Sequence, residues 1–454
     1  MSLQAVNIVV TPAGDQCNVT IDNKTFNNVA VTTVGDIHVA TINSDGVSLL
    51  MRYTDANTVA ANGTVNGETV SYKSDAVAAY AQTFQIPNSD FEGWAASSGE
   101  PDHWHGFKSA KTNWITQLSA GLITLEKSSD VRPGSTGTYS ALTTSGAVGS
   151  TVANGTFTNG LISALSTTAT DKSNHSEMDS TSTSVDKNGD KFYTALYARP
   201  DILKTWFKFS QGTINDEYPY ATISAIVFDG TYYQDPEDNT YTNVAAKGGN
   251  QEITRGDWRE IVMPFDYDSY ASNHATAEAI LITFSTNATP GKGSGGDKIY
   301  VDDLELVYNA AISNIALNGV ALDGFNFDAA TTTYNVTYSG APMAITADNF
   351  VVTADGQSAI VVKNVEDLGN GNYCVTIAVT SPDFKNSALY TINVTKEQEG
   401  VRGDLNDDGV VDVSDINIMI NMMLGTMAQT AAADLDNNGD VDVSDINELI
   451  NIML

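Results

Sequence analysis

Cysteine, basic side chains and long apolar runs are all scarce in this 454-residue chain. Its two cysteines, Cys17 and Cys374, exclude a disulfide framework. There is no apolar run of roughly 18 residues or more, so no transmembrane helix is expected. The 22 Lys and Arg residues face 55 Asp and Glu residues, and the net charge is −33. Such a surface repels phosphate backbones and anionic lipid, which argues against nucleic-acid partners and membrane insertion.

The first residues, Met1 to Gln4, lack the basic and apolar segments of a signal peptide. The protein is therefore either cytosolic or exported by a signal that this sequence does not include. Charged residues make up only 17% of the chain, while Thr, Ser, Asn, Gly and Ala abound. Because that composition is typical of β-rich extracellular domains, we expect an extracellular or bacterial cell-surface location.

Short strands separated by turns dominate the sequence. Apolar and polar residues alternate in bursts, and Asn-Gly or Asp-Gly pairs such as Asn62-Gly63 and Asn66-Gly67 punctuate them. This pattern predicts antiparallel hairpins and a mainly β chain of several β-sandwiches. Together with the motifs and resemblances described below, the expected fold class is jelly roll plus immunoglobulin-like, with a small all-α calcium-binding module at the C-terminus. The predicted domains are a small antiparallel β domain at 1–83, a jelly roll at 84–309, an immunoglobulin-like sandwich at 310–396 and the calcium module at 397–454.

The strongest motif is a repeat at the end of the chain. Residues 404–415, DLNDDGVVDVSD, recur as residues 434–445, DLDNNGDVDVSD. Oxygen-bearing side chains occupy positions 1, 3, 5, 9 and 12 of each copy, and Gly occupies position 6. This is the spacing of an EF-hand loop, in which hard oxygens surround one Ca²⁺ and Gly permits the sharp turn. The repeat therefore predicts two calcium sites.

Each loop runs into an apolar segment that we predict to be a helix. In the first copy Ile416, Met419, Ile420 and Met423 recur at helical spacing, and Ile446, Leu449, Ile450 and Met453 do so in the second. We expect these two stripes to bury each other, with Ser414 and Ser444 capping the helices. Two features differ from a true EF-hand: no helix precedes either loop, and position 12 is Asp rather than Glu.

Residues 402–454 resemble a dockerin module, whose signature is a duplicated loop–helix calcium segment. The resemblance implies two structural calcium ions and docking onto a cohesin-type partner. Carried over by position, the side-chain ligands are Asp404, Asn406, Asp408, Asp412 and Asp415, then Asp434, Asp436, Asn438, Asp442 and Asp445, with backbone carbonyls from Val410 and Asp440. The implied partner contacts are Val413, Ser414, Val443 and Ser444. Ile418, Met422 and Ile452 lie off the predicted stripe, where they serve either helix packing or the partner.

The second domain carries an ordered set of weaker motifs. They are Asn88-x-Asp90-Phe91-Glu92, Pro101-Asp102-His103-Trp104, Gly137-Thr138-Tyr139-Ser140, Asp257-Trp258-Arg259-Glu260 and Tyr300-Val301-Asp302-Asp303-Leu304. The set resembles the jelly roll of carbohydrate-binding modules and, more narrowly, a carbohydrate-metabolism domain of bacterial surface proteins. In such jelly rolls the first and last strands lie together and often share a calcium ion, which implies a second calcium site at Asp90, Glu92 and Asp303.

Sugar binding requires exposed aromatic rings, because the C–H face of a pyranose stacks on a ring while its hydroxyls meet polar groups. Tyr232 and Tyr233 lie in a turn-rich segment and are predicted sugar contacts, together with Trp94 and Trp104. Trp114, Trp206 and Trp258 are also available, although Trp in a sandwich is usually a core residue. His103 and His105 form a His-x-His pair that could bind a transition metal, but no third ligand is evident.

The third domain begins Ile312-x-x-Ile315-x-Leu317-x-Gly319 and continues with Phe325-x-Phe327-Asp328, Thr331-Thr332-Thr333-Tyr334 and Val336. This pattern resembles the cadherin-like β-sandwich repeats of bacterial surface proteins. The resemblance implies a spacer or adhesion module.

Three functions remain open at this point. The first is a non-catalytic protein of polysaccharide utilisation that binds carbohydrate through the jelly roll and docks through the calcium module. The second is a glycoside hydrolase whose catalytic carboxylates lie in the jelly roll, although no pair stands out among so many acids. The third is an adhesion or scaffold protein. We expect a protein that is not an enzyme.

Overall fold

The computed structural model describes residues 5–148, 151–317, 327–328, 330–339, 344–397, 401–406 and 408–454. Strands make up most of the regular structure, and the C-terminal segment contains helices at Val413–Met423 and Val443–Met453. The predicted fold class, mainly β with a small C-terminal helical module, is therefore confirmed. The chain forms two compact units, one of residues 1–314, 352–362 and 377–390 and one of residues 315–351, 363–376 and 391–454. The predicted limits of the individual domains remain predictions.

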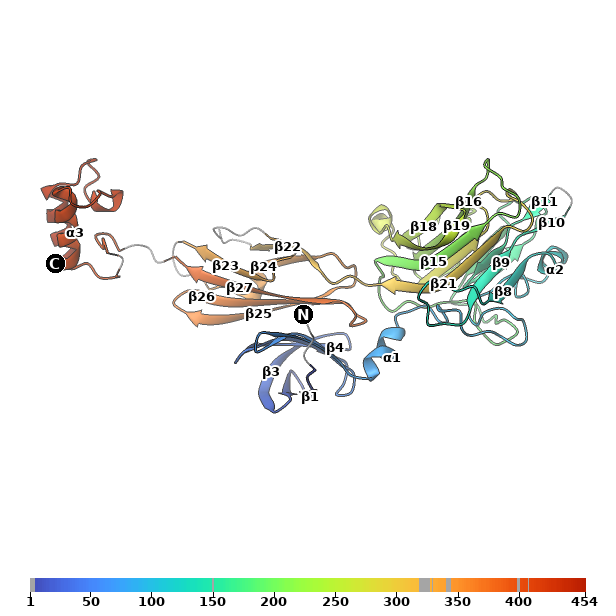
Figure 1. The fold of residues 1–454 in the computed structure, drawn as a ribbon, viewed down its shortest axis with the longest axis horizontal. Helices are drawn as coiled ribbons and strands as arrows, with labels where there is room; N and C mark the ends of the chain where they lie inside the picture. The colour runs from blue at the N-terminus through green and yellow to red at the C-terminus, as the bar shows by residue number, and fades with distance from the viewer. Residues whose placement is uncertain are drawn as a thin grey trace. The chain divides into compact units, whose positions relative to one another are not determined.

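The N-terminal residues form an antiparallel sheet whose seven strands follow one another in chain order (blue in Figure 1). The strands are β1 (Ile8–Ala13), β2 (Gln16–Ile21), β3 (Lys24–Val34), β4 (Ile37–Ser44), β5 (Val47–Tyr53), β6 (Val59–Val65) and β7 (Glu68–Lys73). At the β4–β5 turn Asp45 and Gly46 have φ angles of 53° and 78°. Two successive positive φ angles match the twist of a tight hairpin, which explains the Asp-Gly pair there.

Residues 124–307 contain the two larger sheets of a β-sandwich (Figure 1). One sheet has the order β12 (Thr156–Thr158), β20 (Ala279–Ser285), β16 (Tyr220–Phe228), β18 (Val244–Thr254). The other has the order β19 (Gly256–Pro264), β15 (Ile202–Ser210), β21 (Lys298–Val307), β9 (Ser140–Thr144), β8 (Thr124–Ser128).

Strict alternation along the strands builds the core between these sheets. In β15 every second side chain is buried, and Phe207 of β15 joins Val301 of β21 in a hydrophobic cluster. Ile223 and Phe284 bring the four-stranded sheet into the same cluster. Because successive side chains of a strand point to opposite faces, the alternate residues of the five-stranded sheet must point away from this core.

The remaining helices and strands of residues 76–273 are short. They are α1 (Ala76–Gln82), α2 (Trp114–Ala120), β10 (Gly146–Val148), β11 (Thr151–Ala153), β13 (Leu161–Ala164), β14 (Asn174–Met178), β17 (Tyr233–Asp235) and the 3₁₀ helix η1 (Asp268–Asn273). Strands β13, β14 and β17 pair as a small separate sheet.

Two further sheets lie in residues 312–396. One pairs β22 (Ile312–Leu317) with β24 (Phe350–Ala354), and the other has the order β23 (Thr333–Tyr338), β27 (Ser387–Lys396), β26 (Asn372–Thr380), β25 (Ile360–Gly369). Strands β23 and β27 run parallel, and alternate residues such as Val336 and Ile392 are buried. The 3₁₀ helix η2 (Ala347–Asn349) precedes β24. Gly319 and Phe325 of the cadherin-like pattern lie outside the described residues, as do residues 398–400 of the segment leading into the calcium module.

The C-terminal module contains α3 (Val413–Met423), the 3₁₀ helix η3 (Ala431–Ala433) and α4 (Val443–Met453). Within the described parts of the chain, no helix has both the length and the apolar character that a membrane crossing requires.

Candidate functional site

The last carboxylate of each closing loop is buried and held by backbone amides. Asp445 Oδ1 accepts hydrogen bonds from the N–H groups of Leu435 at 2.6 Å and Asp436 at 3.1 Å, and its Oδ2 accepts from Asp442 N–H at 2.8 Å. Asp415 makes the same three bonds in the first loop, at 2.7, 3.2 and 2.9 Å. Burial raises the pKa of Asp445, but the amide hydrogen bonds outweigh it and the pKa lies below its usual value. This carboxylate therefore ties the end of each loop to its beginning.

The first carboxylate of each loop organises the turn that follows it. Asp434 accepts from Asn438 N–H at 3.1 Å and from Gly439 N–H at 2.9 Å, and Asp404 accepts in the same way from Asp408 and Gly409. Gly439 has a φ angle of 96°, in the region that favours glycine. The Gly at position 6 is thus required by the backbone conformation.

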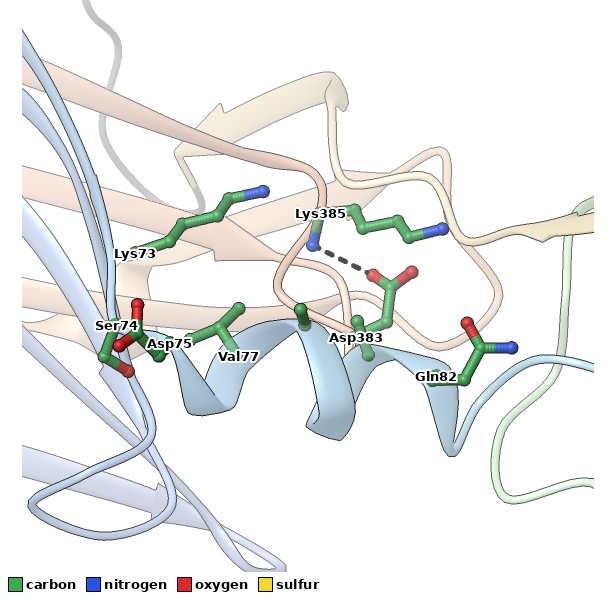
Figure 2. Close-up of a pocket in the computed structure, with 9 residues that line it drawn as sticks. Lys73, Ser74, Asp75, Val77, Gln82, Asp383 and Lys385 are labelled. Carbon is green, nitrogen blue, oxygen red and sulfur yellow. Dashed lines mark hydrogen bonds between the residues drawn. The ribbon is translucent and has the colours of Figure 1, made fainter. Parts of the chain in front are cut away.

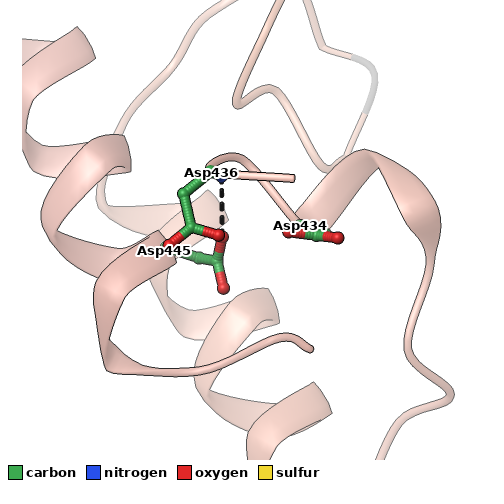
Figure 3. A group of neighbouring side chains, drawn as sticks. All are labelled: Asp434, Asp436 and Asp445. Atoms are coloured by element: carbon green, nitrogen blue, oxygen red, sulfur yellow. Dashed lines mark hydrogen bonds between the residues drawn. The ribbon is translucent and has the colours of Figure 1, made fainter. Parts of the chain in front are cut away.

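Three carboxylates of the second loop lie close enough to share an ion. Asp434, Asp436 and Asp445 each offer one oxygen, and these oxygens lie within 4.8 Å of one another (Figure 3). An all-oxygen donor set of this kind suits a hard cation such as Ca²⁺. The first loop places Asp404, Asn406 and Asp415 at the equivalent positions with the equivalent backbone bonds. The residues present therefore fit calcium, while Asp408, Asn438 and the carbonyls of Val410 and Asp440 remain predicted ligands.

The helix caps differ from the prediction. Asp412 and Asp442 are the N-cap residues, and their Oδ1 atoms accept hydrogen bonds from the N–H groups of Ser414 and Ser444 at 2.7 Å. The assignment of Ser414 and Ser444 as caps was wrong because the helices begin two residues earlier than those caps require, at Val413 and Val443. Position 9 of each loop consequently joins the calcium loop to the helix.

The buried side of the helices follows the predicted stripe only in part: Ile416, Met423 and Ile446 lie against the core, but some other members do not. Ile420 and Ile450, expected in the core, are 38% and 39% exposed, whereas Met422 is only 5% exposed. Met419, Met422 and Leu449 pack with Leu435, Val441 and Ala433 of the second loop region, and Ile418 and Ile452 lie partly buried against them. The helices pack on the loops as well as on each other, which turns their buried faces. Packing thus accounts for Met422 and Ile418, and their predicted partner role is not supported.

This rotation leaves matching apolar stripes on the two helices. Val413, Ile420 and Leu424 are exposed along α3, and Val443, Ile450 and Leu454 are exposed at the same positions of α4. Steps of seven and four residues place the members of each set on one helical face. Ser414 and Ser444 are exposed next to Val413 and Val443. The predicted partner contacts Val413, Ser414, Val443 and Ser444 are all accessible.

The structure does not assemble the predicted second calcium site. Glu92 Oε1 accepts hydrogen bonds from the N–H groups of Thr138 at 2.7 Å and Tyr139 at 2.8 Å. Asp303 Oδ2 lies 2.5 Å from Arg132 Nε, and Asp90 is exposed. In the described parts of the chain, only Asp434, Asp436 and Asp445 bring three such ligand atoms within 4.8 Å of one another. Asp303 is paired with Arg132 and Glu92 supports a backbone turn, so these contacts do not support the set as a calcium site, and it stays a prediction.

Two of the four predicted sugar contacts are core residues. Trp104 is fully buried, and its ring contacts Phe91, Phe157 and Phe284. Tyr233 is buried in a smaller cluster with Phe228, because it begins β17 and faces inward. Stacking of a sugar on either ring is therefore excluded, and both assignments were wrong.

The other two predicted contacts are more accessible. Trp94 is half-buried, and its Nε1 donates to the Phe91 carbonyl at 2.6 Å. Tyr232 is 40% exposed, and its hydroxyl donates to Gln234 Oε1 at 3.0 Å. Glu177, held by Lys111 Nζ and His175 Nε2, lies beside it. Tyr232 remains a predicted sugar contact, now as a single ring beside a charged cluster.

Sequence reasoning named Trp206 and Trp258 as available rings but did not group them with Tyr300 in a row on the outward face of the five-stranded sheet. Trp206 of β15, Trp258 of β19 and Tyr300 of β21 are all half-exposed. The rings of Trp258 and Tyr300 have centroids 6.2 Å apart, and Lys208 Nζ lies 5.5 Å from the Tyr300 centroid. The alternation of side chains along each strand could have revealed this row. Because Phe207 and Val301 point inward, their neighbours in sequence must point outward.

Polar groups surround this aromatic row. Asp130 accepts hydrogen bonds from Trp258 Nε1 and from Lys208 Nζ, each at 2.9 Å. Burial raises the pKa of Asp130, but these two bonds outweigh it and hold the pKa below its usual value. The guanidinium of Arg132 lies 5.4 Å from the centroid of the Trp206 ring. The face thus combines flat rings with fixed hydrogen-bond donors and acceptors.

Asp302 and Asp303 lie in the central strand β21, where Asp302 is opposite Trp206, but their environments differ. Asp302 is buried, and burial raises its pKa to about 6, although it accepts a hydrogen bond from Arg132 N–H at 3.1 Å. Asp303 is paired with the Arg132 side chain. A buried Asp302 cannot reach a glycosidic oxygen, so this pair does not present the two accessible carboxylates that glycoside hydrolysis requires.

A hollow of about 510 Å³ lies beside α1 and is lined by Lys73, Ser74, Asp75, Val77, Ala78, Ala81, Gln82, Asp383 and Lys385 (Figure 2). Asp383 is buried, and its Oδ1 accepts from Lys385 N–H at 3.1 Å and from Ser381 Oγ at 2.6 Å. The lining contains no aromatic ring, so the hollow lacks the stacking surface of a typical sugar site.

The closing loops, caps and helices together define a duplicated calcium-loop module. Residues 402–454 match the family model of the dockerin type I domain. The C-terminal module of this chain is a dockerin, and the match covers that module alone. No curated protein matches the chain.

Three solved structures are similar to this chain at low levels. A candidate glycoside hydrolase from Bacteroides thetaiotaomicron has 14% identity and a TM-score of 0.34, covering 68% of this chain and 95% of that one. The M60 catalytic domain with two CBM51 domains of Clostridium perfringens ZmpB has 11% identity and a TM-score of 0.14, covering 87% and 39%. SGBP-B from a complex xyloglucan utilization locus of Bacteroides uniformis has 12% identity and a TM-score of 0.21, covering 65% and 81%. These values assign no activity to this chain.

Replacing the last carboxylate of the second loop should abolish one of two calcium-binding events. We expect Asp445→Ala to remove both an ion ligand and the acceptor of three backbone amides, so titration calorimetry should detect one calcium ion fewer per chain. Asp440→Ala is the matched control, because only the backbone carbonyl is predicted to bind at that position and Val410 occupies it in the first loop. Equal loss of binding in both variants would contradict the assignment.

Asp302 should make the stability of the sandwich depend on pH. Its pKa of about 6 in the folded protein lies above the value of about 3.9 expected in the unfolded chain. Between about pH 4 and pH 6 the folded state therefore holds a proton that the unfolded state has lost. The stabilisation that this proton provides is complete below about pH 4 and is lost as the pH rises through 6. Asp302→Asn should stabilise the protein at pH 7 by on the order of 2 kcal/mol and leave it unchanged at pH 4. Denaturant unfolding at the two pH values measures the difference, and an equal effect at both would refute this account.

Proposed function

We propose that this protein is a non-catalytic, extracellular or cell-surface component of polysaccharide utilisation. Its dockerin attaches the chain to a cohesin-type partner, and the aromatic face of its β-sandwich binds a neutral polysaccharide. The observation that carries the proposal is the dockerin with its two matching exposed stripes, joined in one chain to a sandwich with a row of partly exposed aromatic rings.

The docking half rests on the two helices of the C-terminal module. Exposed apolar side chains at equal positions on both helices lack an intramolecular role, since the core is already filled by Met419, Met422 and Leu449. Their burial against a partner would be favourable at about 25 cal/mol per Å² of apolar surface. In this proposal the calcium ions are structural: they hold the loops from which both helices begin.

The carbohydrate half rests on the row of Trp206, Trp258 and Tyr300. Rings on neighbouring strands can stack against successive sugar units, while Asp130, Lys208 and Arg132 meet the hydroxyl groups. A protein with a net charge of −33 repels acidic polysaccharides, which favours a neutral one. Tyr232 is an alternative contact outside this row.

Charge placed on the exposed stripes should prevent docking. The double variant Ile420→Asp, Ile450→Asp should lose at least roughly tenfold in affinity for a cohesin module, because each Asp must be desolvated in an apolar contact. Surface plasmon resonance against a panel of purified cohesin modules, with calcium present, measures the loss. Gln429→Glu adds an acid at an exposed position off both stripes and should bind normally. The docking proposal fails if no cohesin module binds the unaltered protein, or if the double variant binds as tightly.

Truncating the rings of the aromatic row should weaken retention on polysaccharide. In affinity electrophoresis with xyloglucan, galactomannan and mixed-linkage glucan, Trp258→Ala and Tyr300→Ala should each weaken binding by roughly 1 kcal/mol or more, as lost stacking requires. Trp114→Ala is the matched control, because Trp114 is 65% exposed on α2, outside this face.

Three results would redirect the carbohydrate half of the proposal. Loss of binding in Tyr232→Ala alone would move the site to the cluster around Glu177. Release of reducing sugars from any of the polysaccharides would establish the glycoside hydrolase instead. Absence of any retention would leave an adhesion or scaffold protein.

A further inference from the structure

A histidine-rich turn of the sandwich faces a loop of oxygen-bearing side chains. His103 and His105 flank the buried Trp104, and the sequence shows no third metal ligand near them. The structure places the loop between Val185 and Lys191, which form an isolated bridge, against this turn. The loop supplies Asp186 and Asp190 as neighbours of the two imidazoles.

Neither ring nitrogen of His105 makes a hydrogen bond of normal geometry. The residue is fully buried, and its ring lies 4.5 Å from that of Phe192. Burial lowers its pKa to about 4, although Asp186, Asp190 and an interaction with the Lys191 backbone oppose the shift, so the ring is neutral at physiological pH. Buried polar atoms are nearly always satisfied, and a buried imidazole without a well-formed hydrogen bond requires an explanation.

The ring of His105 is aimed at a fixed carboxylate. His105 Nδ1 lies 3.7 Å from Asp186 Oδ2, and the Asp186 side chain is only 2% exposed. Asp186 Oδ1 accepts hydrogen bonds from the N–H groups of Asn188 at 2.8 Å and Asp190 at 2.9 Å, while Oδ2 accepts from Asn188 Nδ2 at 3.1 Å. The carboxylate is thus oriented before any ligand arrives.

A second imidazole–carboxylate pair lies beside the first. His103 Nδ1 lies 3.6 Å from Asp190 Oδ1, and Asp190 Oδ2 accepts a hydrogen bond from the backbone N–H of His103 at 3.1 Å. The charges of both residues act on His105. His103 is 45% exposed and Asp190 20%, so both side chains have room to turn.

The nitrogen–oxygen distances of the two pairs, 3.7 Å for His105–Asp186 and 3.6 Å for His103–Asp190, are too long for hydrogen bonds. They are close to the distance between two ligand atoms that bind one ion. Two donors that each lie about 2.1 Å from a tetrahedral zinc ion are about 3.4 Å apart. Two imidazoles with two carboxylates form a nitrogen–oxygen set that suits zinc and related divalent ions rather than calcium, which takes oxygen ligands alone.

We propose that His105, Asp186, His103 and Asp190 form a site for a zinc-class divalent ion, separate from the dockerin loops. His105 and Asp186 are the preformed half. His103 and Asp190 complete the site by turning toward them, since no three of the four ligand atoms yet lie within 4.8 Å of one another. The ion fastens the 185–191 loop to the sandwich.

The site is tested on the full chain without a polyhistidine tag, with millimolar Ca²⁺ present so that the dockerin loops are already filled. In this calcium-containing solution, titration with Zn²⁺ should show one zinc ion bound per chain. Co²⁺ added in place of Zn²⁺ should give the visible absorption bands of a tetrahedral complex. His103→Ala and Asp190→Asn should each weaken Zn²⁺ binding by roughly tenfold or more. Both residues are partly exposed, so these variants should fold, which circular dichroism verifies.

His274→Asn is the matched control. His274 is an exposed histidine of the same sandwich with a φ angle of 52°, a conformation that Asn tolerates. This variant should bind Zn²⁺ like the unaltered chain. The proposal is overturned if the chain binds no Zn²⁺ in the presence of Ca²⁺, or if His103→Ala and Asp190→Asn bind it as tightly as His274→Asn does.

Discussion

A buried carboxylate at the end of each dockerin loop is the interaction on which the C-terminal module depends. Asp415 and Asp445 each accept three backbone N–H groups from residues at both ends of their loop. These bonds fix where the helix begins and bring the first and last carboxylates together. A cluster of like charges held this closely repels itself unless a cation is shared, so the same bonds that shape the loop also create its need for calcium.

Loop closure also determines what the helices present to solvent. Because Leu435 and Val441 of the second loop region enter the core, the helices turn their Met419, Met422 and Leu449 side chains toward it. The opposite faces then carry Val413, Ile420, Val443 and Ile450 outward. The packing of one small core therefore places both the loops and the exposed stripes, which links calcium binding to the proposed docking.

In the sandwich the governing constraint is the alternation of side chains along each strand. The residues that fill the core leave their neighbours on the outward face, and this places Trp206 and Tyr300 beside Trp258 from a strand distant in sequence. Arg132 and Asp130 come from the segment between β8 and β9 and surround the row. The same arrangement pairs Asp303 with Arg132.

The sequence by itself determined the features that depend on local spacing: the mainly β character, the two calcium loops, the helix that follows each loop and the dockerin family of the C-terminal module. The loop ligands follow from spacing because all of them lie within twelve residues of one another. Tertiary structure alone decided the features that depend on packing between distant residues. It buried Trp104 and Tyr233, exposed Ile420 and Ile450, and brought Asp186 and Asp190 to His105 and His103. The reason is physical: a residue's type and periodicity predict that it belongs to a core or a surface, but only the elements packed against it decide which side is covered.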